Sequence, residues 1–271
     1  MKIGIAGLGM IGGSLALALR SSHTVTGFDT DPKTRDDAAR AGIAMAERLE
    51  DLAEADAVII ATPVVAIVPT LTALDSHVDA AVLLDVGSVR APVEHYVRGH
   101  PEGARIVGLH PMAGRSAHGF AAADPALLAG RPFLVVPTQR ADARAMAVAG
   151  EIARTAGGVV TVCSASEHDR IVALVSGLPL ALAAALSVAA AEGVRDLGSF
   201  AGPGFRDTTR VALTSLDLGE GMLRANAANV VHAIARFRGT LDQIEQAVAD
   251  VDVAALRGIL ERAGQVRGAL E

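Results

Sequence analysis

The chain has 271 residues, 51% of them hydrophobic, which is enough for one large domain or two domains with a sizeable core. A formal net charge of -6 and scattered Lys and Arg residues give no basic surface for nucleic acid. The single cysteine, Cys163, excludes an internal disulfide, and no His or Cys spacing predicts a metal site, so we expect none.

Residues 2–29 have the pattern of a dinucleotide-binding unit. Gly7, Gly9 and Gly12 form G-x-G-x-x-G directly after an apolar run, and Asp29 closes the next apolar run. Gly7 permits a tight turn, Gly9 lets the backbone approach a pyrophosphate, and Gly12 allows close packing of helix on strand. A glycine turn without a ligand is the alternative, but the strand, helix and acidic residue all stand at the expected spacing.

The start of the following helix predicts how the cofactor is held. Its free N–H groups, at Met10 and Ile11 among others, and its positive dipole end would face the diphosphate. Asp29 would accept hydrogen bonds from the ribose hydroxyls and repel a 2′-phosphate. We therefore expect NAD as the cofactor.

Short apolar runs continue along the first half of the chain, separated by helical patterns at 32–41 and 141–155. This alternation predicts an α/β fold of the Rossmann type, a doubly wound parallel sheet whose ligands bind beyond the carboxyl ends of the strands. Thr62, Ser88 and His110 follow such runs, and Thr62 is expected to contact the cofactor. The runs cover residues 57–61, 81–86, 105–109 and 132–136.

The pattern changes near residue 164. Ser164 and Glu167 form a capping box that opens a long helix, and only helical periodicity follows. We expect a nucleotide-binding domain over 1–163 and an all-helical substrate and dimerisation domain over 164–271.

The long helix contains nineteen uncharged residues, 173–191, which reaches the lower range for a membrane span. This segment contains Gly177 and Pro179 and has more alanine than leucine, so we interpret it as a helix buried in protein. A small helical layer offers too little surface to bury it alone, which predicts a homodimer and no membrane contact. No secretory signal pattern precedes the first strand, and a cytoplasmic location is expected.

His110 and Ser88 are the candidate catalytic residues. An imidazole at a strand end could take a proton from a substrate hydroxyl as hydride leaves the adjoining carbon. The alternative is a histidine simply hydrogen-bonded in a turn before proline. Ser88 could bridge substrate and imidazole, or cap the helix that starts near Arg90.

Two further groups could face a substrate. Arg206 and Arg210 lie four residues apart, on one face of a predicted helix, where an arginine could hold a carboxylate; a solvated or salt-bridged arginine is the alternative. His168 and Asp169 lie in the first turn of the long helix, where capping or surface roles are equally open.

Four motifs resemble those of the prephenate and arogenate dehydrogenases of tyrosine biosynthesis. They cover residues 7–14, 85–90, 110–114 and 204–210, in the order found in that family. The resemblance implies a helical dimerisation domain and an active site between the domains. It also implies that His110 bonds the ring hydroxyl, that Ser88 orients His110, and that Arg210 holds the side-chain carboxylate.

One motif departs from the family. Where its members usually carry Ser-His-Leu-Pro-His, this chain has Ser176-Gly-Leu-Pro-Leu180, so Ser176 is kept as a substrate-binding residue while both histidines are missing. The resemblance implies NAD-dependent oxidative decarboxylation of prephenate to 4-hydroxyphenylpyruvate, with arogenate as the alternative substrate. A β-hydroxy-acid dehydrogenase would usually need a lysine in the helical domain, and none follows Lys33. A non-catalytic dimeric NAD-binding protein is the third possibility.

Overall fold

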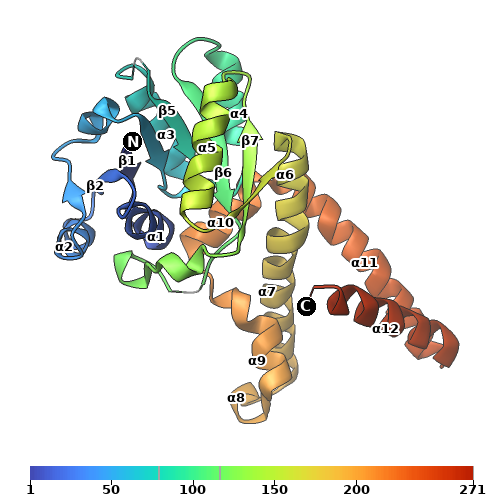
Figure 1. Ribbon diagram of the computed structural model, residues 1–271. Coiled ribbons are helices and arrows are strands. Elements are labelled where there is room, and N and C mark those ends of the chain that lie inside the picture. The colour runs from blue at the N-terminus through green and yellow to red at the C-terminus, as the bar shows by residue number, and fades with distance from the viewer. Residues whose placement is uncertain (79, 116, 271) are drawn as a thin grey trace. The chain divides into compact units, whose positions relative to one another are not determined.

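The protein is described by a computed structural model that covers residues 1–78, 80–115 and 117–270. The chain divides into two compact units, Met1–Asn226 and Ala227–Glu271. The first contains the sheet and the helices up to α10 (Figure 1). The second contains α11 (Ala227–Ala249) and α12 (Val253–Gly268).

An eight-stranded sheet forms the centre of the first unit, in the order β3-β2-β1-β4-β5-β6-β7-β8. Every neighbouring pair is parallel except β6 and β7, so the predicted Rossmann-type fold is confirmed. The strands are β1 (Lys2–Ala6), β2 (Thr24–Phe28), β3 (Ala44–Met45), β4 (Ala57–Ile60), β5 (Val82–Asp85), β6 (Arg105–Pro111), β7 (Pro132–Pro137) and β8 (Val159–Val162).

Helices cover both faces of this sheet (Figure 1). Helices α1 (Met10–Leu19) and α5 (Ala143–Thr155) share one apolar core with side chains from one face of the strands. Helices α3 (Val64–Asp75) and α4 (Ala91–Gly99) share a second core with the opposite face. Burial on both faces explains why the central strands are continuous apolar runs.

The pairing of β6 with β7 is antiparallel, which departs from the fully parallel sheet expected from the sequence. The described residues between β6 and β7, 112–115 and 117–131, contain only two short 3₁₀ turns, Phe120–Ala122 and Pro125–Leu127, and no crossover helix. The chain therefore returns at the same end of the sheet, with Pro111 opposite Phe133. A parallel neighbour would have needed a crossover to the other end.

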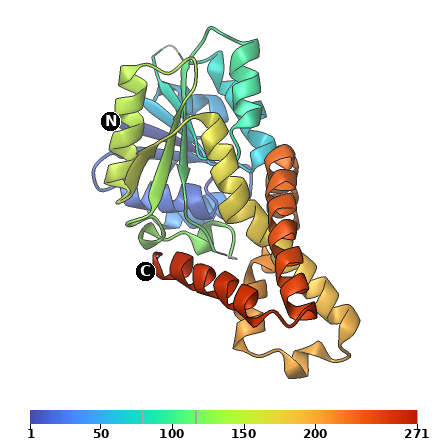
Figure 2. The same cartoon turned by 90° about the vertical axis from the view of Figure 1, so that its right-hand side faces the viewer.

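The predicted capping box opens α6 (Ala165–Val172): the Ser164 hydroxyl accepts from the Glu167 backbone amide, and the Glu167 carboxylate accepts from the Ser164 amide. A π-helical segment, Ala173–Gly177, joins α6 to α7 (Leu178–Gly193). Figure 2 shows α6 beginning beside the sheet. The remaining helices of this unit are α2 (Pro32–Arg40), α8 (Leu197–Phe200), α9 (Pro203–Thr209) and α10 (Leu216–Ala225).

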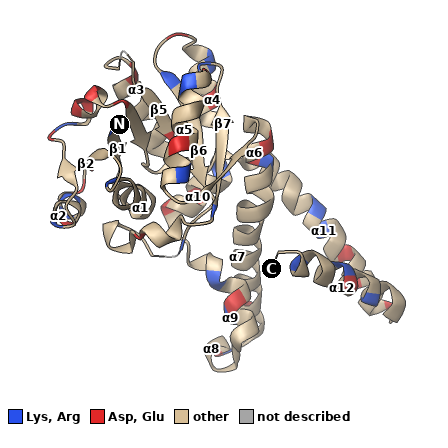
Figure 3. Cartoon of the chain, in the orientation of Figure 1, with Lys and Arg blue, Asp and Glu red and all other residues tan. Residues whose placement is uncertain are grey.

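The continuous helix Ala165–Gly193 is long and apolar enough to cross a membrane, judged by length and composition alone. Its most apolar window has a mean hydropathy of 2.3, and only 22% of that window is buried in the single chain. Figure 3 shows almost no charged residue along α7. Exposed apolar side chains remain along the continuous helix, including Val175 in the π-helical segment and Val188 in α7. The single chain thus leaves uncovered the surface that the sequence predicts to be buried against a partner.

Candidate active site

The turn between β1 and α1 contains three glycines, two of which have no room for a side chain, whereas the third faces free space. Gly7 has a φ of +91°, and a Cβ there would lie 2.7 Å from the carbonyl oxygen of Ala61. A Cβ on Gly12 would overlap the carbonyl oxygen of Gly7. A Cβ on Gly9 would meet no atom within 4 Å, so the space in front of this residue is free. The geometry is that of a backbone prepared for the close approach of a ligand.

The start of α1 offers unpaired donors to that free space. Gly9 is its N-cap residue, no side chain caps it, and no acidic residue lies in its first turn. The amides of Met10 and Ile11 belong to the first turn, whose N–H groups have no partner within the helix. The site therefore suits an anion such as a diphosphate.

Asp29 connects the end of β2 to this turn. Its Oδ2 accepts from the Leu8 amide at 2.7 Å, and its Oδ1 accepts from the Asp31 amide at 2.9 Å. Each oxygen keeps a further lone pair for a ribose hydroxyl. Arg35 also reaches this strand end, which the sequence pattern missed: it donates to the Asp29 carbonyl oxygen at 3.3 Å and lies over the Phe28 ring.

Thr62 and Ser88 follow β4 and β5, at the carboxyl edge of the sheet. Within the described part of the chain, neither buried hydroxyl oxygen has a hydrogen-bond partner. Such an unsatisfied group costs about 1–3 kcal/mol. Parallel sheets bind ligands at this edge. The two free hydroxyls could therefore form hydrogen bonds with a polar cofactor and substrate.

His110, in β6, is held by His168, one of the two residues at the start of the long helix for which the sequence leaves substrate-facing, capping and surface roles open. Its Nδ1 lies 2.9 Å from Nε2 of His168, and Nδ1 of His168 lies 2.8 Å from Oδ1 of Asp169. The carboxylate of Asp169 also accepts from the backbone amides of Arg90 and Ala91, at 2.7 and 3.0 Å. His168 and Asp169 are buried, so the surface roles considered for them are wrong.

The Asp169 contacts also correct the capping interpretation of Ser88. Helix α4 has no side-chain cap from within its own segment, and the Asp169 carboxylate accepts from the amides at its start. Since the Ser88 hydroxyl has no partner in the described structure, it neither caps α4 nor bonds His110. The ring nitrogen of His110 that faces the protein is held by His168.

The surroundings keep His110 neutral. Burial, the neighbouring His168 and the Arg90 guanidinium together lower the pKa of His110 to about 3, with burial as the largest cause. A neutral imidazole at physiological pH can accept a proton. His110 is therefore available as a base.

A buried ion pair lies near this histidine. Arg90 and Asp85 are both fully buried, and the guanidinium meets the carboxylate through both of its terminal nitrogens. Arg90 packs so closely against β6 that a Cβ on Gly108 would lie 2.6 Å from its Cζ. A sequence signal could have predicted the pair: Asp85 ends an apolar strand, and Arg90 follows it five residues later.

The two candidate arginines differ in their contacts. Arg206, in α9, donates to the Ala201 carbonyl oxygen at 3.0 Å, so it stabilises the end of α8 and does not pair with Asp207. Arg210 begins a 3₁₀ turn after α9, is exposed, and has no side-chain hydrogen bond or ion pair to any described residue. Arg210 is thus the one of the two that is free for a ligand.

The motif at residues 176–180, which differs from that of the family, begins within the π-helical segment and continues into α7. Ser176 is half-buried within it, and π-helical turns are frequent at functional sites. Leu180 is buried, and a Cβ on Gly219 of α10 would lie 3.4 Å from its Cδ2. Leu180 therefore contributes to packing between α7 and α10. No contact in the described structure joins Ser176 or Arg210 to His110.

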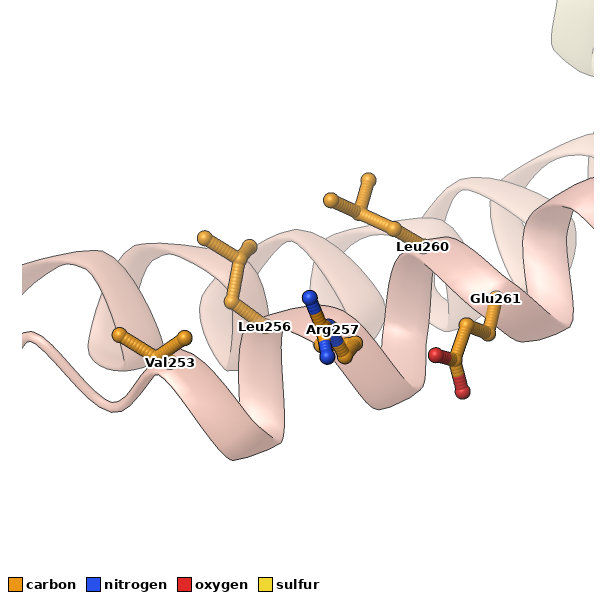
Figure 4. A pocket seen from close by; sticks show the side chains of 5 residues that line it. All are labelled: Val253, Leu256, Arg257, Leu260 and Glu261. Carbon is orange, nitrogen blue, oxygen red and sulfur yellow. The ribbon is translucent and has the colours of Figure 1, made fainter.

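The depression on α12 in Figure 4 carries none of this chemistry. Val253, Leu256 and Leu260 project from the helix there, beside Arg257 and Glu261. No group of three His, Cys, Asp or Glu side chains in the described residues could hold a metal ion.

A Rossmann-type sheet, a glycine turn at a helix N-terminus and a neutral histidine at the carboxyl edge together define a nucleotide-dependent dehydrogenase. Family models for the prephenate dehydrogenase nucleotide-binding domain and dimerization domain match residues 15–162 and 164–262. The chain belongs to the prephenate dehydrogenase family, and the expected NAD-dependent oxidoreductase class is confirmed.

Named relatives agree with this assignment. The prephenate dehydrogenase of Bacillus subtilis is 30% identical over 98% of this chain and 75% of its own length. Prephenate dehydrogenase from A. aeolicus, solved with hydroxyphenyl propionate and NAD+, has a TM-score of 0.92 at 26% identity, covering 100% of this chain and 98% of that one. Synechocystis arogenate dehydrogenase has a TM-score of 0.85 at 30% identity, with both chains fully covered.

Proposed function

We propose that this protein oxidises prephenate to 4-hydroxyphenylpyruvate and CO2 with NAD. The observation that carries the proposal is His110, a neutral imidazole in the strand next to β5, at the edge of the sheet where the glycine turn also lies. The named relatives support the choice of reaction.

The residues around the glycine turn fit NAD. Gly7, Gly9 and Gly12 shape the turn, and the amides of Met10 and Ile11 would face the diphosphate. Asp29 would hold the ribose hydroxyls, and the unsatisfied hydroxyl of Thr62 would donate to the cofactor. When bound, NAD supplies the hydride acceptor.

The reaction needs one base and good alignment. Prephenate has a carbinol carbon para to a ring carboxylate, so loss of hydride from that carbon lets the carboxylate leave as CO2 and makes the ring aromatic. His110 accepts the hydroxyl proton, and the free hydroxyl of Ser88 would hold the same substrate oxygen. Because aromatisation drives the reaction, orientation and a single proton acceptor suffice.

Substrate binding is assigned to Arg210 and Ser176. A free guanidinium suits a carboxylate, and the hydroxyl in the π-helical segment could add a hydrogen bond. Leu180 provides no hydrogen-bond donor where the family usually has histidine. Prephenate is preferred, since no new carboxylate appears in the recognised motifs to bind the ammonium group of arogenate.

Arogenate is the second candidate, because the Synechocystis structure with a similar fold is an arogenate dehydrogenase. Steady-state assays of NAD reduction with each compound, on one enzyme preparation, test the choice. We expect a higher kcat/KM for prephenate. A higher value for arogenate would reverse the assignment, and no reduction with either would refute both.

The helical region is proposed to form a homodimer in the cytoplasm. The matching family model is a dimerization domain, and α7 leaves apolar side chains exposed in the single chain. We propose that the boundary between the nucleotide-binding and helical domains lies at residue 164, a proposal supported by the capping box that opens α6. Light scattering in detergent-free buffer would test the dimer, and a monomer, or protein recovered only with membranes, would contradict it.

A further inference from the structure

His110, His168 and Asp169 form a linear series of hydrogen bonds that ends on a rigid backbone. The series begins at His110 Nδ1, passes through both ring nitrogens of His168, and ends at Oδ1 of Asp169. His168 is fully buried and Asp169 is 5% exposed. Water therefore has little access to exchange these partners.

The directions of these hydrogen bonds follow from the fixed donors. Backbone amides can only donate, and those of Arg90 and Ala91 point to the two oxygens of Asp169, so its carboxylate is the acceptor. Nδ1 of His168 must then carry the proton that it shares with Asp169, and because a neutral imidazole has a single N–H, Nε2 of a neutral His168 is an acceptor. The proton of His110 consequently stands on Nδ1, and its Nε2 is the bare nitrogen.

We propose that His168 and Asp169 are positioning residues that hold His110 in the tautomer with an unprotonated Nε2, the atom that accepts the substrate's hydroxyl proton. This inference rests on the proposed function for the identity of the substrate. As hydride leaves the carbinol carbon, the hydroxyl proton moves to Nε2 of His110, and the imidazolium formed keeps its Nδ1 proton bonded to His168. When the carboxylate then leaves as CO2, the ring oxygen takes the proton back from Nε2 and becomes the phenol hydroxyl of the product. The fixed carboxylate of Asp169 stabilises that positive charge through His168.

Three further charged residues, Arg90, Asp85 and Glu94, lie near the hydrogen-bond series. Arg90 and Asp85 neutralise each other in their buried ion pair. Glu94, in α4, is close enough for its charge to act on Arg90; burial raises the pKa of Glu94, as do the charges of Asp85 and Asp169, although Arg90 opposes them. Asn226 donates to the main-chain carbonyl oxygen of Asp169 at 2.6 Å and so supports the backbone of that residue.

The first test is the tautomer of His110 in the unmodified protein. Nitrogen NMR of protein labelled with ¹⁵N-histidine distinguishes protonated from bare ring nitrogens, and the His110 signals are assigned by their loss in His110→Asn. We expect a protonated Nδ1 and a bare Nε2 on His110, and the same tautomer on His168. A protonated Nε2 on His110 overturns the proposal. This readout needs no substrate, so it stands apart from any failure of the proposed function.

The second test compares two substitutions of His168. His168→Leu removes the acceptor, and we expect kcat to fall by about 10²–10³-fold, with KM for NAD and substrate within about threefold. His168→Gln keeps an amide oxygen that can accept from Nδ1 of His110, so it should restore at least about tenfold of that loss. Val172→Ala, which removes buried apolar atoms from the same helix, is the matched control for local packing, with the His110 tautomer unchanged. A kcat for His168→Leu close to that of the unmodified enzyme, or no rescue by glutamine, overturns the proposal.

Discussion

Arg90 and Asp85 form an ion pair in which neither side chain reaches solvent, with Nη2 of Arg90 2.8 Å from Oδ2 of Asp85. Replacing Arg90 with methionine would leave a buried carboxylate without its partner. Breaking such a pair costs about 3–5 kcal/mol, and we expect the free energy of unfolding in urea to fall by that amount. Arg224→Gln, which breaks the exposed pair with Glu220, is the control and should cost below about 1 kcal/mol. Equal losses for both variants would contradict the assigned role.

Loss of the base should affect turnover and spare cofactor binding. We expect His110→Asn to lower kcat by about 10²–10⁴-fold, the usual scale for removing a general base. The affinity for NAD, measured by quenching or calorimetry, should stay the same. His95→Asn, on the exposed side of α4, is the matched control. Near-normal turnover in His110→Asn would show that another group accepts the proton.

The low pKa of His110 determines the pH dependence of kcat/KM. Because burial, His168 and Arg90 together lower this pKa from 6.5 to about 3, the base is neutral in the free enzyme throughout the physiological range. The profile should show no acid limb near 6.5 caused by His110. An acid limb at 6.5 that disappears in a variant at position 110 would contradict the assignment.

The low pKa of His110 should also make the free energy of unfolding depend on pH. The unfolded chain binds a proton at His110 below about 6.5, whereas the folded chain does so only near 3, so this group lowers stability as pH falls through that window. Urea midpoints at pH 7 and pH 5 should differ less for His110→Asn than for the unmodified protein. An identical difference in both would show that His110 is solvated in the folded state.

Cofactor preference should depend on Asp29. Its carboxylate would face the 2′-phosphate of NADP, so the unmodified enzyme should have the higher kcat/KM with NAD. Asp29→Asn removes the charge, and with Arg35 beside the strand end it should raise the relative use of NADP by about tenfold or more. Asp36→Asn, exposed on α2, controls for a general change in charge. An unchanged ratio in Asp29→Asn would show that its carboxylate points away from the ribose.

Substitutions of Arg210 and Arg206 should differ in their effect on the KM for the substrate. Arg210→Ala should raise KM for the substrate more than it lowers kcat, because a carboxylate clamp acts in both ground and transition states. Arg206→Ala loses a bond to a main-chain carbonyl and should have a smaller effect on KM. The opposite order of KM values would mean that Arg206 is the clamp.

Much of the nucleotide-binding half could be predicted from the sequence, because its signals are local. Gly7, Gly9, Gly12 and Asp29 lie within one strand-turn-helix-strand unit, and Ser164 with Glu167 marks a helix start. The antiparallel β7 was missed because strand direction depends on how the connection returns, and an apolar run has the same composition in either direction.

The histidine series could not be predicted, since it depends on contacts between distant segments. His110 and His168 are 58 residues apart, and Asp169 and Arg90 are 79 apart, so no spacing within a motif connects them. Arg35 was missed for a related reason: the first turn of α2 returns it to the end of β2, six residues after Asp29.

The three small residues Gly12, Gly13 and Ser14 allow α1, at whose start the cofactor would bind, to pack closely against neighbouring backbone. The Ser14 hydroxyl donates to the Met10 carbonyl oxygen at 2.6 Å and accepts from the Asp124 amide at 2.9 Å. A Cβ on Gly13 would come within 2.9 Å of both Ala123 and Phe120. The long connection from β6 is thereby clamped to the helix, and neither can slide without breaking the other's contacts. A substitution that enlarges Gly13 is therefore expected to displace residues 120–124 together with the helix at whose start the diphosphate would bind.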